Sequence, residues 1–242
     1  MLKGHPWYGS FVGLYSQKEN TETKGFSQQV KKEVFDALKP LFDLPIETKM
    51  KNTSDKPFHG YPGPSLLGSP LYESLSIEYA TSYDNVQSFA NLMWPFENEN
   101  FRPAEEDESN VGALVHTDKP FFTILNQNQV DGLEVQIKDS DEWVEIEFLP
   151  SSFVIMETDP FMAWSNGRLR APRHQVVMNG KENRYTIALS TFKNGTVEIP
   201  EELIDDEHPT RFKPFDHYKY LESFAKNPNY LDERAIISFC GV

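Results

Sequence analysis

Short apolar runs separated by turn residues fill the second half of the chain. From residue 111 onward they recur at roughly eight- to twelve-residue intervals, the spacing found in β-sandwiches and barrels. Such runs predict short strands arranged as a double-sheet jelly roll or a barrel. The predicted strands are 111–115, 121–125, 143–148, 153–157, 173–178 and 184–190. The expected fold class is therefore mainly β with flanking helices.

The first half of the chain favours helices and irregular segments. Residues 26–39 place apolar side chains four residues apart, which predicts an amphipathic helix that packs on the sheet. Pro40 should end or kink this helix because proline has no N–H to donate. Shorter helices are predicted at 84–93 and, near the other end of the chain, at 215–227.

An irregular segment is expected at residues 52–70, which are rich in Asn, Pro, Gly and Ser. Its apolar residues Tyr61, Leu66 and Leu67 could line the mouth of a substrate pocket, or they could only cap the fold. Capping is the simpler interpretation, because apolar side chains in a loop usually cover the core beneath them.

Length and charge fit one large domain. A chain of 242 residues can bury a sizeable core. We expect residues 1–110 to form a helical and irregular region that packs on a jelly-roll core, residues 111–242, which includes the last helix. The formal net charge of −14 disfavours nucleic acids and anionic membrane surfaces as partners.

Cysteine content and hydropathy indicate the cellular compartment in which the chain is expected. Cys240 is the single cysteine, so no internal disulfide can form, which fits a reducing environment. The chain has no apolar run of membrane-spanning length, and its first residues lack the hydrophobic centre of a signal peptide. We therefore expect a cytoplasmic monomer whose partner is a small-molecule substrate.

Residues that could bind a metal lie next to the predicted strands. His116 and Asp118 follow the strand 111–115, and side chains two residues apart on a strand point the same way. His174 lies in the strand 173–178. Two imidazoles and one carboxylate make the 2-His-1-carboxylate set of non-haem Fe(II) oxygenases. The alternatives are a solvated turn for the first two residues, and a buried histidine bonded to backbone for the third.

An arginine and a hydroxyl follow in the next strand. Asn179-Gly180 is a strong hairpin signal, so the strand 184–190 should run back alongside the strand that carries His174. Arg184 and Thr186 would then share one face and could grip the far carboxylate of a dicarboxylate co-substrate. A surface salt bridge at a sheet edge is the alternative for the arginine.

These motifs together resemble those of plant Fe(II)/2-oxoglutarate-dependent dioxygenases. The segments that carry the resemblance are His116-Thr117-Asp118, 123–135, 150–154, 163–168, 173–177, Arg184-Tyr185-Thr186, 212–217 and 239–242. The last two look most like the branch that contains the glucosinolate-modifying and auxin-oxidising enzymes. The resemblance is strong over residues 110–242 and weaker over residues 7–95.

By this resemblance His116, Asp118 and His174 are the iron ligands at the catalytic centre. Arg184 would pair with the far carboxylate of 2-oxoglutarate, and Thr186 stands where the family usually has serine, which keeps the hydroxyl. The implied cofactors are Fe(II), the co-substrate 2-oxoglutarate and O2, with ascorbate as a further reductant. The implied reaction of plant secondary metabolism oxidises a small organic metabolite, by hydroxylation, desaturation or a related step, while 2-oxoglutarate becomes succinate and CO2.

The sequence also departs from the family pattern. The family has a long helix and a core strand between its Trp-Pro segment and its His-x-Asp motif, whereas residues 97–108 here are too polar to form them. The family's opening strand has no counterpart before Trp7. We therefore expect a shortened member with an incomplete jelly roll. The alternative function is that of a catalytically inactive relative that binds a metal, a small acid or a partner protein.

Overall fold

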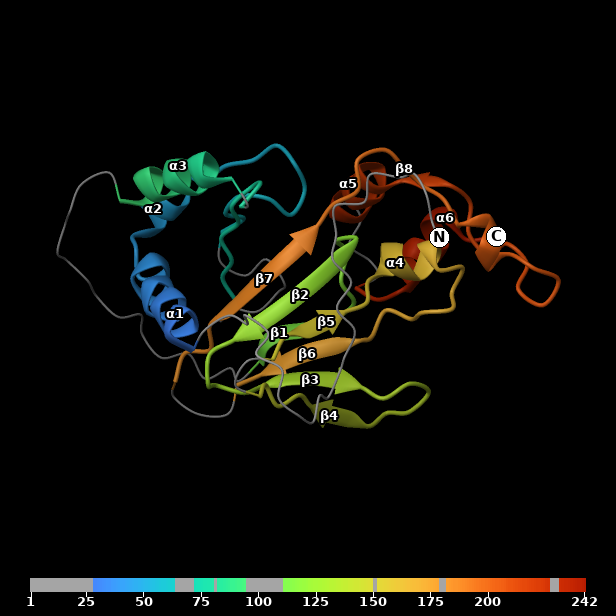
Figure 1. Cartoon of the computed structure of the whole chain (residues 1–242), viewed down its shortest axis with the longest axis horizontal. Helices are drawn as coiled ribbons and strands as arrows, with labels where there is room; N and C mark the ends of the chain where they lie inside the picture. Colours follow the sequence, from blue (N-terminus) through green and yellow to red (C-terminus); the bar gives the residue numbers. More distant parts are fainter. Residues whose placement is uncertain are drawn as a thin grey trace.

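Two antiparallel sheets form the centre of the computed structural model, which describes residues 28–63, 72–80, 82–94, 111–149, 152–178, 182–226 and 231–242 (Figure 1). One sheet has the strand order β1-β6-β3-β4, the other has the order β5-β2-β7, and β8 pairs with β9 apart from both. The strands are β1 (Val111–His116), β2 (Phe122–Gln127), β3 (Leu133–Gln136), β4 (Trp143–Glu145), β5 (Val154–Met156), β6 (His174–Val177), β7 (Thr186–Thr191), β8 (Thr196–Val197) and β9 (Phe215–Asp216).

Helices flank the sheets on two sides (Figure 1). On the side of β7 lie α1 (Gln28–Phe42), α2 (Ile46–Lys49) and α3 (Tyr83–Met93). At the opposite end lie α4 (Asp159–Trp164), α5 (His217–Lys226) and α6 (Arg234–Cys240), with a 3-10 turn at Glu201–Leu203. No helix in the described parts of the chain is long and apolar enough to cross a membrane. The mainly β class with flanking helices is confirmed.

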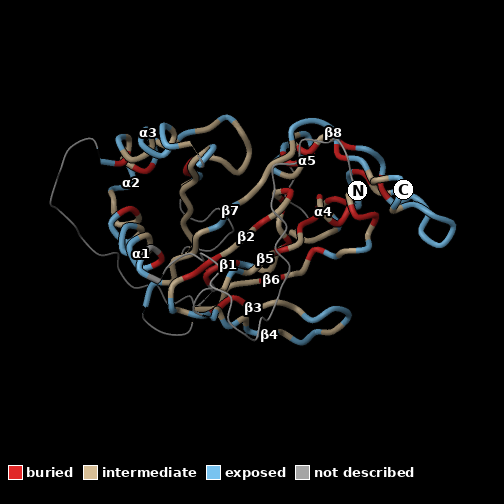
Figure 2. The backbone as a smooth tube through the Cα atoms, in the orientation of Figure 1, coloured by how far each residue is buried: buried red, intermediate tan, exposed pale blue. Residues whose placement is uncertain are grey.

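The most continuous hydrophobic core lies where α4, α5 and α6 meet the ends of the strands. Figure 2 shows buried backbone gathered there and along β2, whereas α1 and α3 are mostly exposed or half-buried. Tyr220 and Leu221 on α5 and Ile236 on α6 are at most 1% exposed. The full cluster is Phe121, Met162, Ala163, Val197, Phe212, Phe215, Tyr220, Leu221, Ile236 and Cys240. This core anchors the C-terminal helices to the strand ends near the predicted ligands.

The predicted helices are present, and one of them extends beyond the residue where it could have ended. Helix α3 matches the prediction at 84–93, and α5 lies within the prediction at 215–227. Helix α1 does not end at Pro40 but runs on to Phe42. Leu41, in the last turn, is only 8% exposed. Because burial of this side chain is favourable, the helix continues past Pro40 although proline cannot donate a hydrogen bond.

The predicted hairpin between the strands of His174 and Arg184 is wrong. β6 pairs with β1 and β3, whereas β7 pairs with β2, so the chain changes sheets between them. The turn at Val130–Leu133 likewise leads from β2 in one sheet to β3 in the other. Turn residues favour a reversal but do not choose the partner strand; in a double-sheet jelly roll, burial of the apolar faces makes that choice.

The connection from β2 to β3 requires a glycine at position 132, and this requirement can be tested. The φ of Gly132, 136°, lies in a region that L side chains avoid, and an added Cβ would lie 2.4 Å from the Val177 carbonyl oxygen. Gly132→Ala is therefore expected to lower the free energy of unfolding by roughly 1–3 kcal/mol, the cost of a strained residue. Urea denaturation of the purified variant measures this change.

Gly195→Ala is the matched control for that experiment. Gly195 also has a positive φ, 81°, but an added Cβ there would meet nothing within 4 Å. It should therefore lose less stability than Gly132→Ala. An equal loss in both variants would show that the close approach to Val177 has no energetic consequence.

Candidate metal centre

Strand pairing brings the two predicted histidine ligands together. His116 ends β1, His174 begins β6, and the two residues are direct partners in the antiparallel register. Their ring centroids are 4.2 Å apart. His174 is buried, whereas His116 is half-buried. The register of β1 against β6 therefore places the two histidine rings next to each other.

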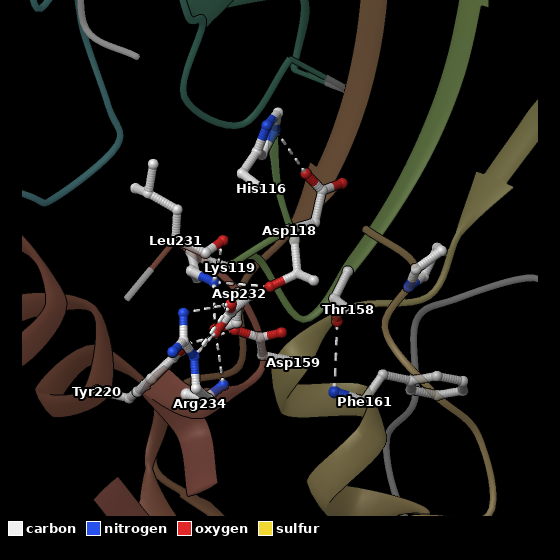
Figure 3. Close-up of polar contacts among 12 residues, drawn as sticks. His116, Asp118, Lys119, Thr158, Asp159, Phe161, Tyr220, Leu231, Asp232 and Arg234 are labelled. Carbon is white, nitrogen blue, oxygen red and sulfur yellow. Dashed lines mark hydrogen bonds and ion pairs between the residues drawn. The ribbon is translucent and has the colours of Figure 1, made fainter. Parts of the chain in front are cut away.

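Asp118 completes the cluster from just beyond the end of β1. Its Oδ1 lies 3.8 Å from His116 Nε2 and 3.5 Å from His174 Nε2, and the first of these contacts is drawn in Figure 3. One ligand atom from each of the three residues lies within 4.8 Å of the others. The structure thus brings together all three residues predicted to bind the metal.

The hydrogen bonds of the two rings leave suitable nitrogen atoms for a cation. His116 Nδ1 lies 2.7 Å from the Leu114 carbonyl oxygen, and His174 Nδ1 lies 3.1 Å from that of Pro172. Because a carbonyl oxygen can only accept, each Nδ1 donates, and in the neutral ring the Nε2 then carries the lone pair that can bind a cation. Two such nitrogens and one carboxylate oxygen fit Fe(II) and leave its other coordination positions open.

Burial and mutual charge set the protonation of the cluster. Burial, helped by the neighbouring His174, lowers the pKa of His116 to about 4. Burial would raise the pKa of Asp118, but its contacts with His174 and His116 outweigh this and hold the pKa at about 2. Burial would lower the pKa of His174, but the neighbouring Asp118 carboxylate outweighs this and raises it. The carboxylate is thus ionised at neutral pH, as metal binding requires.

Arg184 lies two residues before β7 begins, and it shares an electrostatic neighbour, Tyr72, with Asp118. Its Nε and Nη2 donate to Gln127 Oε1 at 3.0 and 2.6 Å. Gln127 is fully buried on β2 and in turn donates to Asp131 Oδ1 at 3.0 Å. Burial lowers the pKa of Arg184 to about 10, so the guanidinium stays charged at neutral pH. An arginine held in this way is preorganised for a carboxylate.

Thr186 stands beside that arginine with an unused hydroxyl. It begins β7 and pairs in register with Gln127 of β2. Its Oγ1 is buried and has no hydrogen-bond partner among the residues that the structure describes. A buried hydroxyl without a partner is unfavourable, so this atom fits a site completed by a polar ligand such as a carboxylate.

Two further residues of the site carry no recognisable sequence signal. Gln127, which orients Arg184, looks like any polar residue at the end of a strand. Tyr72 follows the irregular segment, yet its phenol interacts electrostatically with both Asp118 and Arg184, and burial raises its pKa. Only the folded chain reveals that these side chains reach the site.

Tyr61, in the irregular segment, is held by a hydrogen bond from its side chain. The hydroxyl of Tyr61 donates to Glu73, which also forms an ion pair with Lys49 at 2.6 Å. Tyr61 is buried, which agrees with the prediction that it caps the fold. Leu66 and Leu67 lie outside the described residues.

Comparison with known proteins identifies relatives over nearly the whole chain. The profile of the 2OG-Fe(II) oxygenase superfamily matches residues 85–193. The probable 2-oxoglutarate-dependent dioxygenase AOP1.2 of Arabidopsis thaliana is 33% identical, over 99% of this chain and 88% of the relative. The 2-oxoglutarate-dependent dioxygenase DAO of Oryza sativa subsp. japonica is 30% identical, over 76% of each chain.

The alignment with AOP1.2 also tests the expected shortening. It extends over 295 positions, more than the 242 residues of this chain, so the relative contains residues that have no counterpart here. This agrees with a chain that lacks segments of the family. Residues 97–108, where the shortening was expected, lie outside the described residues.

Solved structures show the same relationship. The crystal structure of the rice dioxygenase for auxin oxidation has a TM-score of 0.67 and 27% identity, covering 88% of this chain and 85% of its own. The 2-oxoglutarate complex of DAO1 from Arabidopsis thaliana has a TM-score of 0.58 and 26% identity, and the match covers 76% of this chain and 86% of DAO1. By sequence and by fold, this chain belongs to the 2OG-Fe(II) oxygenase superfamily and, within it, to the 2-oxoglutarate-dependent dioxygenases.

Proposed function

We propose that His116, Asp118 and His174 bind Fe(II) in this chain and that the enzyme oxidises a small organic metabolite. The observation that carries the proposal is the convergence of three ligand atoms within 4.8 Å, one from each residue. The backbone contacts of both Nδ1 atoms support it, because they direct each Nε2 to the same point. A structural cluster would not require both rings to present the same nitrogen.

Arg184 and Thr186 would hold the co-substrate. The guanidinium is buried, charged and fixed by Gln127, and the Thr186 hydroxyl lacks a partner among the described residues. A charged fork and a hydroxyl together suit the far carboxylate of 2-oxoglutarate. Tyr72, whose phenol interacts electrostatically with Asp118 and Arg184, would help to shield the co-substrate from water.

The bound iron would supply the redox chemistry that couples oxidation of the metabolite to conversion of 2-oxoglutarate and O2 into succinate and CO2. The protein residues keep Asp118 ionised, keep the Nε2 atoms of the histidines available, and orient the dicarboxylate through Arg184. We assign this work to a core at residues 111–242, on which residues 1–110 pack. A small organic substrate also agrees with the rice structural relative, which is a dioxygenase for auxin oxidation. A cytoplasmic location is proposed from the buried, single Cys240.

Two observations favour a second candidate, a catalytically inactive relative. The AOP1.2 alignment shows that this chain lacks residues present in the relative. In addition, β7, which begins two residues after Arg184, pairs only with β2 among the described strands. A co-substrate site beside an unsupported strand could bind a metal or a small acid without completing the reaction.

Succinate formation decides between the two candidates. The purified chain is incubated with Fe(II), 2-oxoglutarate, ascorbate and O2, and succinate is quantified against the Asp118→Ala variant. We expect slow Fe(II)-dependent succinate formation even without a metabolite, because these groups suffice for the decarboxylation. Tight binding of Fe(II) and 2-oxoglutarate without any succinate would instead favour the inactive relative.

A further inference from the structure

Asp118 is held in a different way from the two histidines. His116 and His174 are fixed by the register of paired strands. β1 ends at His116, so Asp118 lies outside the strand ladder. Its backbone carbonyl instead accepts a hydrogen bond of 3.0 Å from the N–H of Asp159, the first residue of α4. The third candidate ligand therefore depends on contacts outside the sheets.

The residues on either side of Asp118 are tied to the C-terminal part of the chain. The N–H of Thr117 donates to the Leu231 carbonyl at 2.8 Å. The carbonyl of Lys119 accepts from His217 Nε2 at 3.0 Å, and His217 is fully buried on α5. Three consecutive residues are thus bonded to segments that lie far away in the sequence.

The side chain of Lys119 is the centre of this network (Figure 3). It is only 4% exposed, and its Nζ donates to Asp159 Oδ2 at 2.6 Å and to Thr117 Oγ1 at 2.8 Å. The carbonyl oxygens of Leu231 and Asp232 lie 3.4 Å from the same nitrogen. A buried ammonium group with four oxygen neighbours holds these segments in one arrangement.

Asp159 links the network back to the site. Its carboxylate is fully buried, and Oδ2 also accepts a hydrogen bond of 2.9 Å from the Tyr220 hydroxyl on α5. Apolar residues of similar volume are often as stabilising as a buried ion pair, so the pair is not explained by stability alone. Its directional bonds, in contrast, fix the backbone that carries Asp118.

We propose that the Lys119–Asp159 ion pair positions Asp118 for metal binding, which makes Lys119 a positioning residue of the metal centre. The inference rests on the proposed function, because it presumes that Asp118 is a ligand. It also makes the C-terminal helix α5, which supplies Tyr220 and His217, part of the support of the site.

Co(II) binding tests this proposal, because the visible spectrum of Co(II) reports its coordination geometry. Lys119→Met alone would leave the Asp159 carboxylate buried without its cation and could prevent folding. The main variant is therefore the double replacement Lys119→Met with Asp159→Asn, which removes both charges. Lys219→Met, an exposed lysine on the same helix as Tyr220, is the control. Circular dichroism checks that each variant is folded.

The double variant is expected to bind Co(II) about tenfold more weakly, the lower end of the effect of losing outer partners of a metal site, and to show a shifted visible spectrum. A role in folding alone predicts the parent affinity and the parent spectrum in the folded double variant, and that result would overturn the proposal. If the parent itself showed no Co(II) binding that depends on His174, the proposed function would fail instead.

Tyr220→Phe decides the matter if the double variant does not fold. It keeps both charges and removes only the hydroxyl that donates to Asp159. The proposal expects a smaller loss of Co(II) affinity, about threefold, because one hydrogen bond is removed while the ion pair remains. Unchanged affinity and spectrum in this variant would then refute the positioning role.

Discussion

Replacing His174 with alanine is expected to reduce the affinity of the chain for Fe(II) by more than about 100-fold, beyond the range seen when only outer partners of a metal site are lost. His174 is the buried member of the cluster, and its Nε2 lies 3.5 Å from Asp118 Oδ1. Removing it leaves one imidazole and one carboxylate, which cannot hold a divalent ion on one face. Anaerobic calorimetry with Fe(II) measures the loss.

Replacing a histidine outside the cluster is the control, because it shows whether loss of any histidine lowers the affinity for Fe(II). His208 is about half exposed and pairs with Asp205, away from the cluster. His208→Ala should therefore bind Fe(II) as the parent does. If His174→Ala, shown to be folded by circular dichroism, kept the parent affinity, His174 would not be a ligand.

Arg184→Ala is expected to weaken 2-oxoglutarate binding by about 10- to 100-fold, since hydrogen bonds to charged groups contribute roughly 1.5–3 kcal/mol. Fe(II) affinity should change little, because the arginine contacts Gln127 rather than the metal cluster. Titration of the Fe(II)-loaded protein with 2-oxoglutarate, without O2, gives the affinity.

Two further variants sharpen that experiment. Arg184→Lys keeps the positive charge but loses the planar fork, so its affinity for 2-oxoglutarate should lie between those of the parent and the alanine variant. Arg168→Ala removes a partly exposed arginine paired with Asp205 and should change nothing. Equal 2-oxoglutarate affinity in the parent and Arg184→Ala would refute the assigned role.

The identity of the candidate ligands could be predicted from the sequence, and the family resemblance implied that they converge, but the strand pairing that brings them together could not be predicted. His116 and Asp118 are close in sequence, so a local rule sufficed for them. His174 joins them only through the register between β1 and β6, two strands far apart in the chain. Hydrophobic alternation shows which face of a strand is buried but not which strand becomes its neighbour.

The same limit explains the errors in topology. Asn179-Gly180 predicted a hairpin, yet the strands on its two sides lie in different sheets. Helix α4 was not predicted, although Thr158 caps it by accepting a hydrogen bond from Phe161 N–H and Pro160 stands in its first turn. At six residues, this helix is too short for an apolar period to reveal it.

The supporting residues were the hardest to foresee. Nothing in the sequence distinguishes Lys119 from a surface lysine, because its burial depends on carbonyl groups contributed by Leu231 and Asp232. Gln127 likewise becomes part of the site only when it meets Arg184. Residues that hold ligands in place are defined by tertiary contacts, whereas the ligands themselves are restricted by chemistry to a few residue types.

Anaerobic titration of the purified chain with Fe(II) and 2-oxoglutarate tests the central claim most directly. Chelation of the iron by 2-oxoglutarate produces a visible charge-transfer band, which requires the metal site and the co-substrate site to work together. We expect this band in the parent and its loss in His174→Ala. A folded, monodisperse parent that shows no band at saturating Fe(II) and 2-oxoglutarate would contradict the claim that these residues form a dioxygenase centre.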